Sequence, residues 1–172
     1  LQANTDRIAL QIDIRNAYNS PNHQKLLEII KNDAPYLYEF SKLTMGEKVG
    51  KTKFNEETIE LQKGIHQGGT LSTTQFCIGL HSVLKPIIET EDYSEIHMVN
   101  ISDNITIIGL PDKVLKMNKD IKTVLKEKLD LNLAPEKSII YGFNEDYCQA
   151  HIQEAINSNF IWMPAKGGVT FA

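Results

Sequence analysis

The stretch His97-Met-Val-Asn-Ile-Ser-Asp-Asn-Ile-Thr-Ile-Ile-Gly109 is an apolar run that is divided near its middle by a polar pair, Asp103 and Asn104. The apolar residues on both sides are mostly β-branched and have polar residues between them, which is typical of strands. Asp and Asn also tolerate a tight turn well. The run therefore predicts a β-hairpin that carries the Asp103 carboxylate at its tip.

A second apolar strand is expected at Ile8-Ala-Leu-Gln-Ile-Asp-Ile14, and it also ends in a carboxylate, Asp13. Hard cations such as Mg²⁺ bind through one or two protein carboxylates, while water and substrate phosphates complete the ligand shell. Two such ions can assist phosphoryl transfer. If the two strands lie side by side, Asp13 and Asp103 are the candidate ligands of a divalent metal.

The composition is that of an ordinary globular protein. The 172 residues suit one domain with a sizeable core, and 41% of them are hydrophobic and 23% charged. No run approaches the roughly 18 apolar residues of a membrane span, and Cys77 and Cys148 lack the spacing of a zinc site. We expect an intracellular protein, in the nucleus or the cytoplasm, that does not enter a membrane. The net charge of −4 argues against a nucleic-acid binder that acts alone, because backbone binding needs clustered Lys and Arg.

Helices and further strands are predicted around these two strands. The sequence favours a helix that Ser20 caps and Pro21 opens. It also favours a longer helix that starts with a capping box of Ser72 and Gln75 and that Pro86 kinks or ends. The other predicted elements are a short helix at 35–40, a ribbon at 45–63, a helix at 111–130, a strand ending at 141, a helix at 146–158 and a short strand at 160–163. This order predicts an α+β fold, an antiparallel sheet with helices packed on one face.

The segment Gly64-Ile-His-Gln-Gly-Gly-Thr-Leu-Ser72 has three glycines in its first six residues. Glycines allow positive φ and a close approach of the backbone to a ligand or to another segment. The segment is interpreted either as a plain loop that leads into the following helix or as a loop that contacts a ligand.

Three segments resemble, in order and in style, the A, B and C motifs of reverse transcriptases: Asp13-Ile-Arg-Asn-Ala-Tyr-Asn-Ser20, Gly64 to Ser72, and Ile101-Ser-Asp-Asn-Ile-Thr-Ile-Ile-Gly109. Leu131-Asn-Leu-Ala-Pro-Glu-Lys137 looks like their D motif. The resemblance covers residues 6 to 143 and is strongest to non-LTR, LINE-type retrotransposon enzymes. It implies a polymerase palm, and residues 1–172 are interpreted as a single palm fragment of a parent chain that supplies fingers before it and a thumb after it.

The resemblance implies a role for each residue that matches a motif position. Asp13 and Asp103 would hold two Mg²⁺ or Mn²⁺ ions, with Asn104 beside them, and Lys137 would protonate the pyrophosphate leaving group. Tyr18 would be the steric gate that rejects a ribonucleotide. The implied nucleotide- and template-binding residues are Arg15, Asn16, Tyr18, Gln67 and Gly68. The implied partners are an RNA template, a DNA primer, a dNTP, and the fingers and thumb of the parent chain.

The C motif departs from the family pattern, aromatic-Ala-Asp-Asp, because Asn104 stands where a second Asp is usual. An amide ligates only through its carbonyl oxygen and adds no negative charge. From the residues alone, Tyr18 also fits a core aromatic and Lys137 a surface charge. Three functions stay open: an RNA-directed DNA polymerase, a catalytically inactive domain that scaffolds RNA or protein, and an RNA-templated RNA polymerase.

Overall fold

The computed structural model describes residues 6–45, 50–54, 57–142, 153, 155–157 and 159–164. The chain divides into two compact units. The first contains residues 1–14, 87–122 and 133–172, and the second contains residues 15–86 and 123–132. The interpretation of residues 1–172 as a single palm fragment stays a prediction.

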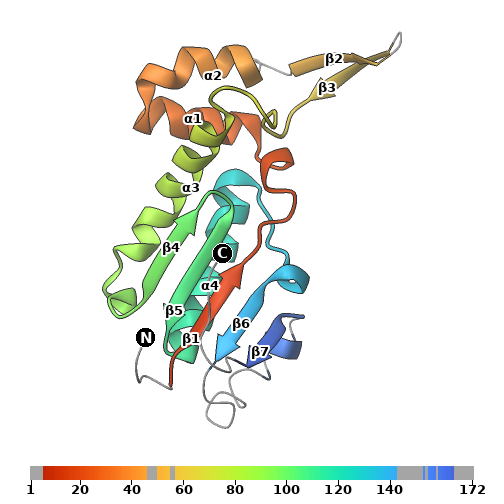
Figure 1. Ribbon diagram of the computed structural model, residues 1–172. Helices are drawn as coiled ribbons and strands as arrows, with labels where there is room; N and C mark the ends of the chain where they lie inside the picture. Colours follow the sequence, from red (N-terminus) through yellow and green to blue (C-terminus); the bar gives the residue numbers. More distant parts are fainter. Residues whose placement is uncertain are drawn as a thin grey trace. The chain divides into compact units, whose positions relative to one another are not determined.

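Helices and strands follow one another along the chain in the predicted order (Figure 1). The strands are β1 (Ile8–Ile12), β2 (Gly50–Phe54), β3 (Glu57–Leu61), β4 (His97–Ile101), β5 (Asn104–Gly109), β6 (Ile139–Gly142) and β7 (Ile161–Pro164). The α-helices are α1 (His23–Asp33), α2 (Tyr38–Met45), α3 (Ser72–Ile88) and α4 (Pro111–Leu129). Short 3-10 turns are η1 (Ala17–Asn19), η2 (Pro35–Leu37), η3 (Glu91–Tyr93) and η4 (Pro135–Lys137).

The first unit is built on a five-stranded sheet with the strand order β4-β5-β1-β6-β7 (Figure 1). β1 pairs antiparallel with β5 and β6, and β4 pairs antiparallel with β5, whereas β7 runs parallel to β6. The hairpin predicted at 97–109 is confirmed, and its second strand lies directly beside β1. The predicted α+β fold with helices packed against the sheet is also confirmed, but the sheet is not wholly antiparallel as predicted, because β7 runs parallel to β6.

One face of this sheet is closed by apolar packing. Leu10 and Ile12 of β1 and Ile107 of β5 are fully buried, and the alternation of side chains along a strand puts the β1 pair on one face. Val114 and Ile121 of α4 are buried to the same degree, and they lie seven residues apart on one side of the helix. Figure 1 shows the first part of α4 behind the sheet, so the buried face is the one that this helix covers.

A buried tyrosine ties η3 to α4. Tyr93 is 4% exposed, and its hydroxyl donates a hydrogen bond to Asp120 of α4. Burial, followed by the hydrogen bond to Asp120, raises the pKa of Tyr93 far above its ordinary value. Lys116 adds an ion pair of 2.8 Å to Asp92. These contacts hold the segment that leads into β4.

The second unit contains α1, α2 and the ribbon of β2 and β3, which confirms the ribbon predicted at 45–63. The predicted start of α1 is wrong by two residues. Its N-cap is Asn22, whose side chain accepts a hydrogen bond from the Lys25 N–H. Ser20 does not cap the helix, because its hydroxyl donates to the Arg15 carbonyl instead.

The capping box predicted at the start of α3 is also wrong. Gln75 is buried, and its side-chain amide donates to the hydroxyls of Ser41 at 3.0 Å and Thr44 at 3.3 Å, both in α2. A buried amide needs partners, and the nearest ones come from another helix rather than from the end of its own. α3 continues through Pro86 to Ile88.

The predicted strand at 160–163 is confirmed as β7. Most of the helix predicted at 146–158 lies outside the described residues, as does Cys148. Within the part of the chain that the structure describes, no helix has both the length and the apolar character needed to cross a membrane.

Candidate active site

The tip of the β4–β5 hairpin lies one residue earlier than predicted. Ile101 pairs with Asn104, so the two turn residues are Ser102 and Asp103, and Asn104 is the first residue of β5. Ser102 has a φ of 56°, in the left-handed region that the tight two-residue hairpin turns require at their first position. The turn thus places Asp103 at the end of the sheet, as expected, whereas Asn104 is part of the paired strands β4 and β5.

The pairing of β1 with β5 brings Asp13 to the same end of the sheet. The last pair of this register is Ile12 with Ile105, so the residues that follow in register are Asp13 and Asn104. Asp103 comes next to Asn104 in the turn. Because side chains alternate, Asp13 belongs to the face opposite to buried Ile12. The structure therefore brings Asp13, Asp103 and Asn104 together at adjoining strand ends.

Both carboxylates are available to a ligand. Asp13 and Asp103 are half-buried, and neither side chain makes a hydrogen bond or ion pair within the described part of the chain. The described residues contain no group of three or more His, Cys, Asp or Glu that could hold a metal ion. The donor set is therefore two carboxylates with a neutral amide beside them, which fits Mg²⁺ or Mn²⁺ only with water and substrate phosphates as further ligands.

A ring of three hydrogen bonds fixes the backbone of Asp13. The Asp13 N–H donates to the Ser138 hydroxyl at 3.0 Å, and the Ala134 N–H donates to the Asp13 carbonyl at 2.9 Å. The Ser138 hydroxyl in turn donates to the Ala134 carbonyl at 2.9 Å, and Ser138 is fully buried. Exposed Lys137 immediately precedes this serine, in η4. The ring thus ties the Asp13 backbone to the segment that carries Lys137.

Ser138 was not predicted from the sequence, because nothing distinguishes it from an ordinary turn serine before the strand pairing is known. The isolated bridge between Ile14 and Leu133 continues the same contact beyond the end of β1. We call Asp13, Ala134 and Ser138 the Asp13 clamp.

The remaining candidates lie in the second unit, and Tyr18 is the best supported of them. Its ring stacks on Phe76 with 4.8 Å between the ring centroids and 25° between the ring planes, and its hydroxyl lies 3.4 Å from the Thr73 hydroxyl. Tyr18 is half-buried, so it packs as a core aromatic does and stays partly accessible to solvent. Arg15 and Asn16 are exposed just before it, and Asn16 adopts the left-handed conformation with φ 48°.

The glycine-rich loop is bonded to the segment that carries Tyr18. The Ile65 N–H donates to the Tyr18 carbonyl at 2.6 Å, and the Gly64 N–H donates to the Pro21 carbonyl at 2.9 Å. Gly64 has a φ of 89°, and a Cβ atom on it would lie 3.0 Å from the backbone oxygen of Asn19. Only glycine fits at this position, because the backbone of the neighbouring segment approaches so closely.

Gln67 and Gly68 lie at the open part of this loop. Both are exposed, Gly68 has a φ of 85°, and a Cβ atom on it would meet nothing within 4 Å. Buried His23 contacts the start of the loop, because its Nε2 donates a hydrogen bond to the Gly64 carbonyl at 2.5 Å. Like Ser138, His23 was not singled out from the sequence, because one histidine at a helix start carries no signal. The ligand-binding interpretation of the loop stays a prediction.

A five-stranded sheet with packed helices and carboxylates at the ends of adjoining strands is the architecture of a polymerase palm. Residues 1–151 match the family described as reverse transcriptase (RNA-dependent DNA polymerase). Because the match covers most of the chain, the chain belongs to the reverse transcriptase family. The assignment to the LINE-type branch stays a prediction.

Similar solved structures are telomerases. The apo telomerase from Candida tropicalis, truncated from the C-terminal domain, has a TM-score of 0.57 at 16% identity, over 78% of this chain and 30% of that one. The telomerase from Candida albicans in complex with the TWJ fragment of telomeric RNA has a TM-score of 0.59 at 12% identity, over 78% of this chain and 27% of that one. This chain thus spans less than a third of the length of either telomerase, and the likeness shows the fold. None of the curated proteins matches the chain.

Proposed function

We propose that the chain is the palm of an RNA-directed DNA polymerase that joins a dNTP to a primer 3′-hydroxyl. The observation that carries this proposal is the register of β1 and β4 against β5, which puts Asp13 and Asp103 at one end of the sheet. Neither carboxylate is used in a structural contact within the described residues, so both are left for a ligand. Membership of the reverse transcriptase family supports the same class of reaction.

Asp13 and Asp103 would hold Mg²⁺ or Mn²⁺, whose chemistry there is Lewis-acid stabilisation of the reacting phosphoryl oxygens. The Asp13 clamp holds the backbone that carries the first carboxylate, because both backbone polar groups of Asp13 are hydrogen-bonded to the residues on either side of η4, Ala134 and Ser138. Lys137 is exposed and has no partner within the described residues, so its ammonium group can supply a proton to a pyrophosphate leaving group.

The second unit supplies features that suit a nucleotide. Rotation of the Tyr18 side chain would break its stacking on Phe76, so the ring is held in one orientation. A ring held in this way suits a steric filter that admits a dNTP and rejects a ribonucleotide. Gln67 and Gly68 offer an exposed amide and an open backbone on a loop that is bonded to Tyr18. Arg15 and Asn16 add an exposed cation and amide to the same segment.

The proposed partners are an RNA template and a DNA primer. One of the telomerases of similar fold is solved in complex with a fragment of telomeric RNA, which supports an RNA template for this chain. The net charge of −4 means that most of the basic surface for the duplex has to come from the fingers and thumb of the parent chain.

A second candidate function, a domain that scaffolds RNA or protein without catalysis, is favoured by one observation. Asn104 follows in register beside Asp13, where the family pattern has a carboxylate, so the site has less negative charge for a divalent ion. An RNA-templated RNA polymerase is the third candidate, and it differs from the first in the nucleotide that it accepts.

Primer extension by the parent chain separates the three candidates. The reaction contains a primed RNA template, Mg²⁺ or Mn²⁺, and either dNTPs or NTPs, and compares the native protein with Asp13→Asn. The matched control is Asp33→Asn, which removes an exposed carboxylate at the end of α1. We expect extension with dNTPs that falls by at least about 10³-fold in Asp13→Asn and is unchanged in the control.

Each other outcome has a definite meaning. Extension with NTPs rather than dNTPs would identify an RNA polymerase. No extension by the native protein with either nucleotide set, combined with RNA binding, would identify a scaffold. Equal loss in Asp13→Asn and Asp33→Asn would show that the loss does not come from the sheet end.

A further inference from the structure

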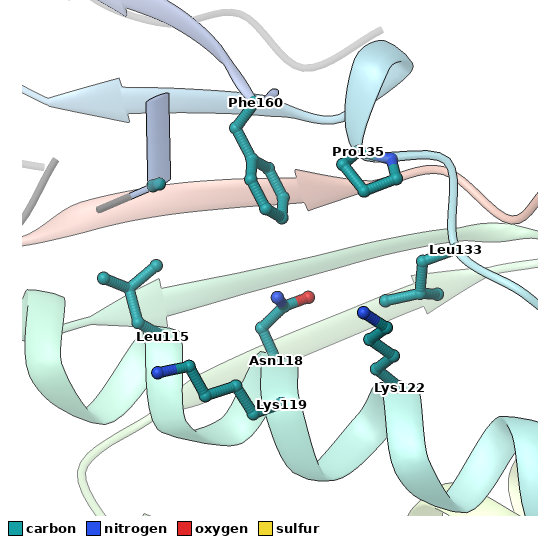
Figure 2. A pocket seen from close by; sticks show the side chains of 8 residues that line it. Leu115, Asn118, Lys119, Lys122, Leu133, Pro135 and Phe160 are labelled. Atoms are coloured by element: carbon teal, nitrogen blue, oxygen red, sulfur yellow. The ribbon is translucent and has the colours of Figure 1, made fainter. Parts of the chain in front are cut away.

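A cavity of about 150 Å³ lies in the first unit on the side of α4 (Figure 2). Its lining comes from α4, from the start of η4 and from the residues just before β7. The apolar residues of the lining are Leu115, Leu133, Pro135, Ala155 and Phe160. The polar ones are Asn118, Lys119 and Lys122.

Asn118 is the buried polar group of this cavity. Its side chain is 8% exposed, and its Oδ1 has no hydrogen-bond partner within the described part of the chain. Figure 2 shows the amide rising from α4 toward the ring of Phe160. A buried acceptor without a donor destabilises the folded chain, because the oxygen has given up its hydrogen bonds to water. Asn118 Oδ1 is therefore an acceptor that a donor entering the cavity could satisfy.

The size and lining of the cavity define the entering group. An apolar cavity of about 150 Å³ is large enough for one benzene ring. The half-exposed side chains of Leu115 and Phe160 leave it open to solvent, so a larger ring system can extend through the mouth. An indole ring has an apolar body and a single N–H donor and no acceptor, which is the complement of one buried carbonyl oxygen between apolar walls.

The edge of the cavity is positively charged. Lys119 and Lys122 are both exposed and lie three residues apart, so they share one side of α4. Lys122 has no ion pair within the described residues, whereas Lys116 of the same helix is paired with Asp92. In a chain of net charge −4, the exposed ammonium group of Lys122 beside an apolar cavity favours a partner that carries acidic residues.

We propose that this cavity is an anchor site for a partner protein, which inserts a tryptophan from an acidic segment. The indole packs against Phe160 and the leucines, its N–H donates to Asn118 Oδ1, and a flanking carboxylate lies against Lys122. A buried aromatic anchor with a charged rim is the usual form of a small protein–protein binding site. The proposal is independent of catalysis at Asp13.

The test uses fluorescence anisotropy with the 172-residue chain and three labelled peptides. The first is Glu-Asp-Trp-Glu-Asp, the second has Phe in place of Trp, and the third has Lys in place of each acidic residue. We expect the Trp peptide to bind about tenfold more tightly than the Phe peptide, because only indole donates a hydrogen bond. The lysine-flanked peptide should not bind, and the affinity of the acidic Trp peptide should fall as salt is added.

Variants of the chain test each contact separately. Asn118→Leu removes the buried acceptor, so it should make the Trp and Phe peptides bind equally and raise the thermal midpoint of the free chain by about 2–4 °C. Lys122→Glu should abolish binding of the acidic peptides. The matched control is Lys128→Glu, a charge reversal at an exposed position in the last turn of α4, which should leave binding unchanged.

Three results would each overturn the proposal. Equal binding of the Trp and Phe peptides to the native chain would show that Asn118 does not recognise a donor. A lower thermal midpoint in Asn118→Leu would show that the amide already has a partner in the free chain. Absence of binding by the acidic Trp peptide would exclude this class of partner.

Discussion

Asn104 sets the charge of the sheet end at which Asp13 and Asp103 meet. We expect Asn104→Asp to increase the affinity of the chain for Mn²⁺ by about tenfold, because a third carboxylate adds charge to the donor set. The same change should destabilise the metal-free chain by about 0.5–1 kcal/mol, since it places like charges on neighbouring strands. Isothermal titration with Mn²⁺ and urea unfolding without metal measure the two effects.

The matched control for this prediction is Asn100→Asp. Asn100 is exposed on β4 and pairs with Ile105, so its side chain belongs to the face opposite to Asn104. An equal gain of Mn²⁺ affinity in both variants would indicate a general charge effect, and would contradict a metal site at Asp13 and Asp103.

Ser138 is the residue on which the Asp13 clamp depends. We expect Ser138→Ala to destabilise the chain by about 1–3 kcal/mol, because it leaves the Asp13 N–H without its partner and removes one of the hydrogen bonds to the Ala134 carbonyl. It should also weaken Mn²⁺ binding, since the Asp13 backbone is no longer held at the end of β1. Urea unfolding and Mn²⁺ titration of the same variant test both expectations.

Ser41→Ala is the control for a stability effect alone. Ser41 is a fully buried serine that accepts a hydrogen bond from Gln75 in the second unit. The Ser41→Ala variant should be destabilised by a similar free energy of unfolding and should keep the Mn²⁺ affinity of the native chain. If Ser138→Ala also keeps its Mn²⁺ affinity, the clamp is structural and does not position Asp13.

At the scale of elements, the end of α4 is fixed by charge as well as by backbone hydrogen bonds. Asp130 follows the helix with a φ of 60°, and its carboxylate pairs with Lys126 at 2.6 Å and with Lys63, the residue before Gly64. The hydrogen bonds from Lys126 and then Lys63 lower the pKa of Asp130 to about 2. The ion pairs therefore connect the end of α4 to the entry of the glycine-rich loop.

The lowered pKa of Asp130 predicts how stability depends on pH. A depressed pKa stabilises the fold above the ordinary Asp pKa of about 3.9, and this stabilisation is lost as pH falls from there toward 2. We expect Asp130→Asn, which keeps a residue that tolerates positive φ, to be less stable by about 0.5–1 kcal/mol at pH 7. Urea unfolding of both proteins between pH 7 and pH 2 should show curves that converge in acid. A gap that stays constant with pH would contradict the role of the ion pairs.

The elements themselves were largely predictable, and their ends were not. The strand at Ile8 and the hairpin at 97–109 follow from short local runs of apolar, mostly β-branched residues. The cap at Ser20 and the capping box at Gln75 were wrong because side chains from other segments compete for the same hydrogen bonds. The hairpin turn consists of Ser102 and Asp103, not of Asp103 and Asn104 as predicted. The reason is that the pairing of Ile101 with Asn104 decides which residues form the turn, whereas the prediction relied on their polarity.

At the scale of the whole molecule, the charge predicts weak binding of nucleic acid by residues 1–172 alone. A chain of net charge −4 displaces few counterions from a duplex, so we expect a dissociation constant above about 10⁻⁶ M for an RNA–DNA hybrid near physiological salt. Fluorescence anisotropy across a salt series should also give a shallow dependence on salt. Nanomolar binding with a steep dependence would contradict the expectation that the parent chain supplies the basic surface.

The sequence by itself determined the order of elements, the two candidate carboxylates and the resemblance to reverse transcriptases, because apolar periodicity and short motifs are properties of neighbouring residues. Only the tertiary structure decided that Asp13 follows in register next to Asn104, that Ser138 holds the Asp13 backbone, and that Asn118 is buried without a donor. These features depend on hydrogen bonds and packing between segments far apart in the chain, and a strand register that differed by one residue would change the first two.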